Sequence, residues 1–129
     1  MLTAACHCTG CQRMTAGPYS LSALYPADRF QLIEGETVLG GLKGAARHHC
    51  CEDCLSWLFT LPAGLDGLVN VRTAMLERAS EFPPFAEFYR AEGLPGVASG
   101  ASRSFDMAPS ADEFLRLSES YRDWDGRPA

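Results

Sequence analysis

The chain of 129 residues is long enough for one domain with its own core, and its 47% hydrophobic and 21% charged residues are ordinary for a globular protein. The net charge of −5 makes the phosphate backbone of a nucleic acid a poor partner. No stretch approaches the roughly 18 uninterrupted apolar residues that a bilayer crossing needs, and residues 1–5 do not resemble a signal peptide. We therefore expect one cytoplasmic domain over residues 1–129, with neither nucleic acid nor membrane as partner.

The first strand signal is an alternation of larger apolar residues with smaller or polar ones between positions 19 and 25. This period of two is typical of a half-buried strand. Further short strands are predicted, with glycine and proline between them, at 30–33, 37–39, 47–50, 57–61, 67–73 and 86–90. This succession of short strands and turns predicts a mainly β domain.

The C-terminal part follows a different pattern. Residues 93–104 are rich in glycine, alanine and serine and predict a mobile loop. Ser110 and Glu113 have the spacing of a capping box, and apolar residues follow at helical spacing. We therefore expect one amphipathic helix over 111–123, which packs its apolar side on the core.

The cysteines carry the clearest chemical signal. All six lie in two tight clusters, at positions 6, 8 and 11 and at positions 50, 51 and 54. A disulfide framework normally spreads its cysteines across the fold, and neighbours this close in sequence pair poorly. Reduced thiols in the cytoplasm are the better explanation, although Cys50 by itself is well explained as a buried residue.

The first cluster reads Cys6-His7-Cys8-Thr9-Gly10-Cys11, in which Gly10 permits a tight turn inside a C-x-x-C unit. Cys6 lies two residues before Cys8, so an extended backbone projects both side chains to the same side. Three thiolates can then converge on one soft cation, and thiolate ligands favour Zn²⁺ over hard cations. Cys51-Glu52-Asp53-Cys54 is a second C-x-x-C unit, and two such units in one short chain strongly indicate metal binding.

Two partitions of these ligands are open, and composition alone favours the first, in which Cys6 is spare. In one, Cys8, Cys11, Cys51 and Cys54 form a single closed, structural four-cysteine site. In the other, Cys6, Cys8 and Cys11 hold a zinc ion whose fourth position is open, while Cys51 and Cys54 belong to a second site. The choice matters because a closed site serves folding, whereas an open site can take part in chemistry.

A wider pattern around the cysteines resembles the glutathione-dependent formaldehyde-activating enzyme family, which also includes centromere protein V. The resemblance covers about residues 4–90 and comprises Cys6-His-Cys8-x-x-Cys11-Gln-Arg-x-x-x-Gly17, Tyr25-Pro26, Phe30, Gly35-Glu36 and Cys51-x-x-Cys54. It implies a compact, complex β fold resembling the Mss-four-like zinc-binding fold, here with one C-terminal helix. The fold's core would span about 4–90, followed by a loop and helix over 91–129.

The resemblance also implies two zinc ions. The catalytic one would be held by Cys6, Cys8 and Cys11, and the structural one by Cys51 and Cys54 with an earlier Cys-x-Cys pair. The implied activity is that of a carbon–sulfur lyase resembling S-(hydroxymethyl)glutathione synthase, with glutathione as the small-molecule partner. No catalytic residue is expected beyond the metal ligands. The alternative is a non-catalytic structural zinc module for protein interaction.

The chain departs from the family pattern around the second cluster. The earlier Cys-x-Cys hairpin is missing, and Leu55 stands where a glycine commonly follows the last cysteine. Cys50, His48 or His49 is then a candidate to complete that site, unless the natural start lies upstream or the site is empty. Adjacent strand residues point in opposite directions, so at most one histidine could help, and solvated surface histidines are favoured. The oligomeric state is left open, and a dimer is conceivable.

Four other residues near the clusters are not expected to bind the metal. Alternation turns His7 away from the metal, which favours an orienting role or exposure over ligation. Arg13 could attract a glutathione carboxylate, but a solvent-facing arginine is favoured. Glu52 and Asp53 are expected to be surface acids.

Overall fold

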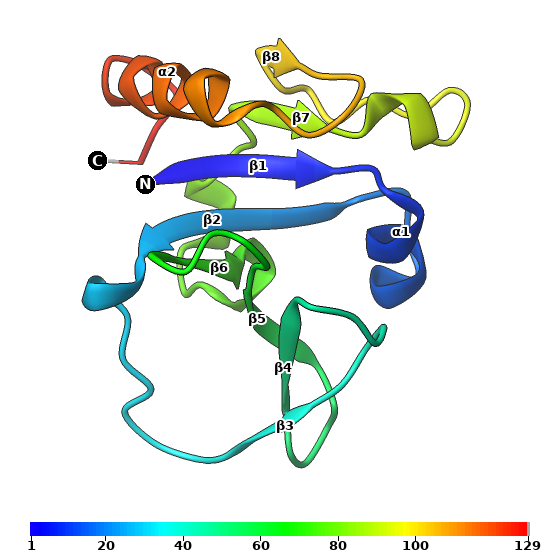
Figure 1. Cartoon of the computed structure of the whole chain (residues 1–129), viewed down its shortest axis with the longest axis vertical. Coiled ribbons are helices and arrows are strands. Elements are labelled where there is room, and N and C mark those ends of the chain that lie inside the picture. Colours follow the sequence, from blue (N-terminus) through cyan, green and yellow to red (C-terminus); the bar gives the residue numbers. More distant parts are fainter. Residues whose placement is uncertain (129) are drawn as a thin grey trace.

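The computed structural model describes residues 1–128, so the last residue of the predicted domain, Ala129, lies outside the described residues. The described chain forms one eight-stranded sheet in the order β3-β4-β5-β6-β2-β1-β7-β8, with two α-helices (Figure 1). The elements are β1 (Leu2–Cys6), α1 (Thr9–Thr15), β2 (Ser20–Pro26), β3 (Thr37–Leu39), β4 (Arg47–Cys51), β5 (Trp57–Leu61), β6 (Leu68–Arg72), β7 (Ala86–Phe88), β8 (Arg103–Ser104) and α2 (Ala111–Arg122). The prediction of a mainly β fold with a C-terminal helix is confirmed.

Strand β1 joins two differently paired parts of the sheet. It pairs antiparallel with β2 and parallel with β7. Parallel neighbours need a crossover connection, and residues 73–85 supply it between β6 and β7. This connection passes over one face of β1, where Thr3 Oγ1 donates a hydrogen bond to the Pro83 carbonyl at 2.7 Å.

The opposite face of the sheet collects side chains from five strands. Directly paired residues point to the same side, and each strand contributes every second residue. The registers therefore place one set together, which we call the pocket face: Ala4, Cys6, Ser20, Ser22, Leu24, His48, Thr60, Asn70 and Arg72.

Helix α2 covers one end of this face. Leu117 and Tyr121 of the helix pack with Leu2, Phe85 and Ala86 in the main buried cluster. The helix begins at the predicted capping box, in which Ser110 Oγ accepts from the Glu113 N–H and the Glu113 carboxylate accepts from the Ser110 N–H. None of the helices within residues 1–128 has both the length and the apolar character needed to cross a membrane.

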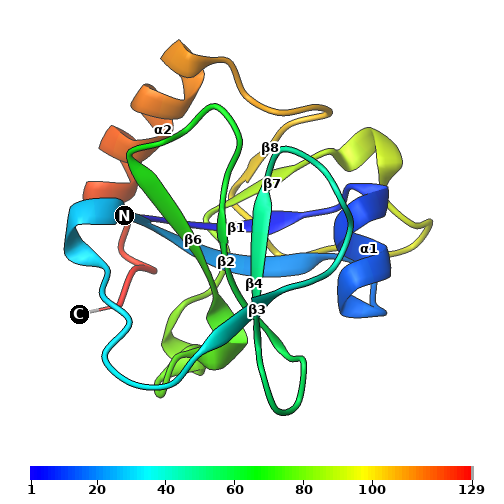
Figure 2. The same ribbon diagram turned by 60° about the horizontal axis from the view of Figure 1, so that its bottom comes forward.

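The sheet is strongly twisted, so that β3 and β4 run steeply across the direction of β1 and β2 (Figures 1 and 2). At one end of β4, the loop 40–46 packs against α1. A Cβ atom added at Gly41 would overlap Met14 Cε, and one added at Gly10 would lie 3.1 Å from Leu42 Cδ1. Glycine at both positions thus allows the loop and the helix to approach closely.

Most of the predicted strands are confirmed within a residue or two, and the segments 37–39 and 57–61 match β3 and β5 to the residue. The strand predicted at 30–33 is wrong. Phe30 packs on Phe59 with ring centroids 4.8 Å apart, but Ile33 is 90% exposed and the segment pairs with no other strand of the described chain. The predicted loop at 93–104 is correct except for its last two residues, which form β8.

Truncation of the buried face of α2 should destabilise the fold. Leu117 is 5% exposed, so Leu117→Ala should lower the free energy of unfolding by about 2–5 kcal/mol through lost burial and the cavity left behind. Leu115, two residues earlier on the same helix, is 63% exposed, so Leu115→Ala should change it by less than about 0.5 kcal/mol. Urea denaturation of both variants measures the difference, and equal losses would contradict the packing of α2.

Candidate functional site

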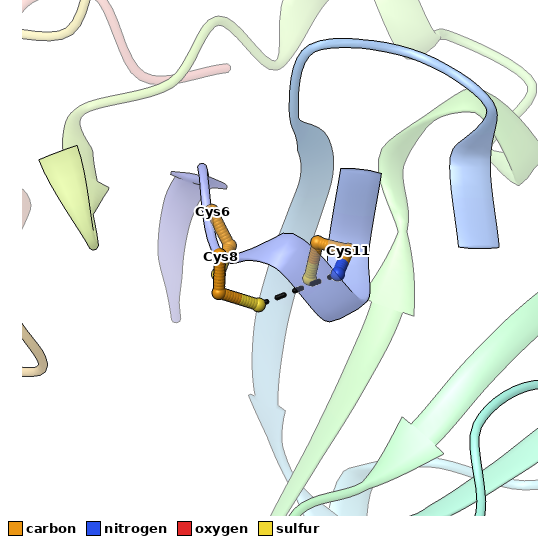
Figure 3. Close-up of side chains that lie close together, drawn as sticks. All are labelled: Cys6, Cys8 and Cys11. Carbon is orange, nitrogen blue, oxygen red and sulfur yellow. Dashed lines mark hydrogen bonds between the residues drawn. The ribbon is translucent and has the colours of Figure 1, made fainter. Parts of the chain in front are cut away.

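Three cysteine side chains meet where β1 ends and α1 begins. The sulfur atoms of Cys6, Cys8 and Cys11 all lie within 4.8 Å of one another (Figure 3). Cys6 is the last residue of β1, and the other two belong to the start of α1. Among residues 1–128, this is the single group of three or more metal-ligating side chains gathered at such distances.

The C-x-x-C unit forms the first turn of a helix. Cys8 is the N-cap of α1, and its sulfur accepts a hydrogen bond from the Cys11 N–H at 3.3 Å (Figure 3). Serine, threonine, asparagine or aspartate usually fills this role. The expected tight turn at Gly10 is therefore helical, and the lack of a side chain there serves the contact with Leu42 instead.

The three thiols of the cluster differ in pKa. Hydrogen bonds from the Cys11 and Cys6 thiols, and from backbone N–H groups, lower the pKa of Cys8 to about 2. The pKa of Cys6 is raised, first by its hydrogen bonds with Cys11 and Cys8 and then by burial. One thiolate is therefore held by two protonated neighbours, and a bound cation would take the place of those protons.

The arrangement fits a tetrahedral metal ion with one open position. Zinc–sulfur bonds of about 2.3 Å in a tetrahedron put the sulfurs about 3.8 Å apart, and the three sulfurs here need to move inward by only a small amount. Three thiolates are also the ligand set expected for a soft, tetrahedral cation. The Cys6–Cys8–Cys11 cluster can thus hold a metal ion through three protein ligands.

His7 is fully buried and takes no part in the cluster, so of the two expected alternatives exposure is wrong and an orienting role remains. Arg90 Nη1 lies 3.3 Å from His7 Nδ1, and arginine can only donate, so Nδ1 accepts and Nε2 carries the hydrogen. That hydrogen is directed at Glu87 Oε2, 2.9 Å away. Ser99 Oγ donates to the same oxygen at 2.6 Å. His7 therefore fixes the backbone between two cysteines to β7 and to the loop after it.

A second set of contacts ties α1 to the same region. The Glu92 carboxylate accepts from the Thr9 N–H at 2.7 Å and from the Thr9 hydroxyl at 2.9 Å. Gln12 Nε2 donates to the His7 carbonyl at 2.6 Å and to the Glu92 carbonyl at 2.9 Å. The cysteine loop is consequently held on both sides by residues some 80 positions later in the chain.

The second C-x-x-C unit lies at the turn between β4 and β5, at the end of β4 away from the loop that packs on α1. Cys54 is exposed, and its pKa is lowered, mainly by its contact with Ser56. Cys51 is close enough to add to this effect. The structure therefore brings Cys51 and Cys54 together but does not place them with Cys8 and Cys11, as a single closed site would require.

None of the three candidates for completing the second site, within the described residues, joins Cys51 and Cys54 in a metal-ligating group. His48 Nδ1 lies 2.9 Å from Thr60 Oγ1, and His49 Nδ1 lies 2.9 Å from Thr37 Oγ1, so neither half-buried histidine is the solvated residue expected. Cys50 is buried beneath Gly40, as expected for a packing residue. Glu52 and Asp53 are exposed, and so is Arg13.

A cavity of about 440 Å³ opens beside Cys6 and Cys11 on the pocket face. Its lining includes Trp57, Arg72 and Tyr89, none of which the sequence pattern indicated. Tyr89 has a left-handed backbone with φ of 57°, and its pKa is raised by burial and by the charges of the cysteine cluster. A bulky residue in that conformation is strained, and such strain often accompanies a functional site.

Acid should weaken the connection between His7 and β7. Burial tends to raise the pKa of Glu87, but hydrogen bonds from Ser99 and His7 and the charge of Arg90 lower it overall. The stability that Glu87 contributes is thus fully present above its unfolded pKa of about 4.3 and is lost as the pH falls through its lower folded pKa. Glu87→Gln should flatten the decline in the free energy of unfolding below about pH 4.3, as measured by urea denaturation across pH. An unchanged decline would contradict the contact.

Leu55 should be replaceable by glycine with a gain in stability. Its φ is 60°, a conformation that costs a non-glycine residue about 1–2 kcal/mol, and its side chain is 66% exposed. Leu55→Gly removes that strain but gives the unfolded chain more freedom, so we expect a net gain of up to about 1 kcal/mol. Leu65→Gly, at an exposed loop position with no positive φ, is the control and should destabilise.

Comparisons with known proteins bear on the fold and on the family. A crystal structure of a Rhodobacter sphaeroides protein superposes with a TM-score of 0.50 at 19% identity, over 59% of this chain and 69% of that one, which supports the fold. No curated protein matches the sequence significantly. The family model described as glutathione-dependent formaldehyde-activating enzyme matches residues 1–92. The chain therefore belongs to the glutathione-dependent formaldehyde-activating enzyme family.

Proposed function

We propose that the protein binds zinc through Cys6, Cys8 and Cys11 and binds glutathione beside it, acting as a carbon–sulfur lyase that forms or cleaves the adduct of glutathione and formaldehyde. The observation that carries the proposal is the convergence of three sulfurs at the edge of a cavity large enough for a small ligand. Membership of the family supplies the substrate class.

The chemistry needs a reactive sulfur held next to a small electrophile. In the forward direction the glutathione sulfur attacks the carbonyl carbon of formaldehyde and forms a carbon–sulfur bond. The carbonyl electron pair moves to oxygen, which takes up the proton lost by the thiol; cleavage is the reverse. Zinc bound to the three cysteines would stabilise the thiolate form of a thiol ligand at neutral pH.

The chain's own residues position this reaction. His7 and Gln12 hold residues 6–11 against β7 and the segment after it. These contacts fix the positions of the three sulfurs relative to one another. Cys6 and Cys11 border the cavity, which supports an open ligand position on that side. Cys51 and Cys54 would contribute to a second, structural zinc site, and free thiols in both clusters are consistent with a cytoplasmic protein.

Removal of one cluster cysteine should separate ligand binding from folding. Cys6→Ser should lower glutathione affinity at least tenfold, because one of three metal ligands is lost, while the thermal melting temperature changes by only a few degrees. Calorimetric titration with glutathione, together with zinc equivalents per chain by elemental analysis, measures both effects. Unchanged glutathione binding in a variant that has lost zinc would refute the proposal.

Cys54→Ser is the matched control, because it removes an exposed cysteine outside the cluster. It should leave glutathione affinity within about twofold of the wild type. If the second site binds metal, zinc should fall from about two equivalents to about one, and the melting temperature should drop. A melting temperature that collapses in Cys6→Ser as well would instead indicate a purely structural role for the first site.

A further inference from the structure

The cavity beside the cysteine cluster has an unusual charge distribution. Arg72 is the only arginine or lysine among its lining residues, and no aspartate or glutamate lines it. His48 also lines it, but burial and the charge of Arg72 lower the pKa of this histidine, so it is neutral at pH 7. The rest of the lining is largely apolar and includes Leu24, Trp57 and Phe114.

Arg72 is buried without an acidic partner. It is 5% exposed, and no carboxylate within residues 1–128 forms an ion pair with it. Its guanidinium group lies over the Trp57 ring, 3.8 Å from the centroid, and Nη2 donates a long hydrogen bond of 3.4 Å to the Asn70 carbonyl. Nε is buried and has no hydrogen-bond partner. A buried guanidinium left in this state is costly unless an anion completes it.

The cysteine cluster compensates for this charge only in part. Burial lowers the pKa of Arg72 to about 10, and the negative charges of Cys11 and Cys6 would act to raise it only once these two cysteines are deprotonated. In the sheet, Arg72 pairs with Ser22, and Cys6 pairs with Ser20 on the same face. With strands about 4.8 Å apart and a rise of about 3.4 Å per residue, the Cα atoms of Arg72 and Cys6 lie roughly 12 Å apart. The guanidinium and the sulfur can therefore contact two ends of one small molecule.

We propose that the cavity binds thiols through one carboxylate, with that carboxylate on Arg72, the apolar part against Trp57, and the sulfur toward Cys6 and Cys11. The sulfur end of this inference rests on the proposed function, whereas the carboxylate end does not. In glutathione, the glycyl carboxylate is the group that fits Arg72. The γ-glutamyl ammonium group stays outside, because no acidic residue lines the cavity to pair with it.

The test compares two thiols of nearly equal size, N-acetylcysteine and N-acetylcysteine amide, by calorimetric titration of the zinc-loaded full chain. The wild type should bind the acid about tenfold more tightly than the amide, because a charge-assisted hydrogen bond is lost in the amide. Arg72→Gln should reduce this ratio to about one. Arg13→Gln removes an exposed arginine and should keep the wild-type ratio. A ratio that persists in Arg72→Gln overturns the inference.

Two further measurements keep the outcome decisive. Arg72→Lys retains the charge but loses the planar, bidentate donor, so it should lower the preference for the acid over the amide about threefold. This variant keeps the inference testable even if Arg72→Gln does not fold. Zinc content is measured in each variant. Loss of zinc with an unchanged preference for the acid would make Arg72 only a counter-charge for the cluster and would overturn the inference.

A carboxylate without a thiol separates this inference from the proposed function. 3-Phenylpropionate should bind to the wild type and to Cys6→Ser but about tenfold more weakly to Arg72→Gln. If neither thiol binds but 3-phenylpropionate does so in this pattern, the proposed function fails and the carboxylate site stands. Failure of 3-phenylpropionate to bind the wild type overturns the carboxylate site whatever the thiols do.

Discussion

The parallel pairing of β1 with β7 is the constraint on which the site depends. It continues beyond the strands as a hydrogen bond of 3.0 Å from the His7 N–H to the Phe88 carbonyl, so the backbone between the first two cysteines is part of the sheet's extension. The same pairing brings Glu87 and Arg90 to the His7 ring and Glu92 to the first turn of α1. The cysteine geometry is therefore set by a strand more than 80 residues away, and the short helix that carries Cys11 contributes little stability by itself.

Much of the fold was predictable because strand alternation and helix capping are local signals. The strand β2 and the Ser110–Glu113 capping box were both confirmed, although burial in β2 does not alternate as predicted, because Ser20 and Ser22 are buried too. The segment 30–33 was misassigned because a short apolar run cannot show whether a partner strand is available, and only Phe30 finds a packing partner. The burial of His7 was missed for a related reason: its partners come from β7 and the loop after it, and no local pattern contains them.

The distinction between local sequence signals and contacts of distant segments also applies to the site. Spacing showed that Cys6, Cys8 and Cys11 can converge, because all three lie within six residues, but only the family resemblance favoured this set over a closed four-cysteine site. The cavity beside them could not be predicted, because its lining comes from strands that are distant in sequence and adjacent only through the sheet order. Arg72 lies in the strand predicted at 67–73, and nothing in the sequence distinguishes it there. Its significance comes from burial over Trp57 with no acidic neighbour, which only the three-dimensional structure shows.

The contact between Met14 and Gly41 has a consequence for how this sequence can vary. The methionine side chain occupies the space where any β-carbon at position 41 would lie, and the glycine has φ of 72°. The two positions are consequently coupled sterically: a larger residue at 41 requires a shorter one at 14 and a rearranged loop. Such a substitution would displace α1, the helix that carries both Met14 and Cys11. A change in the loop 40–46 would therefore alter the position of Cys11 in the sulfur cluster.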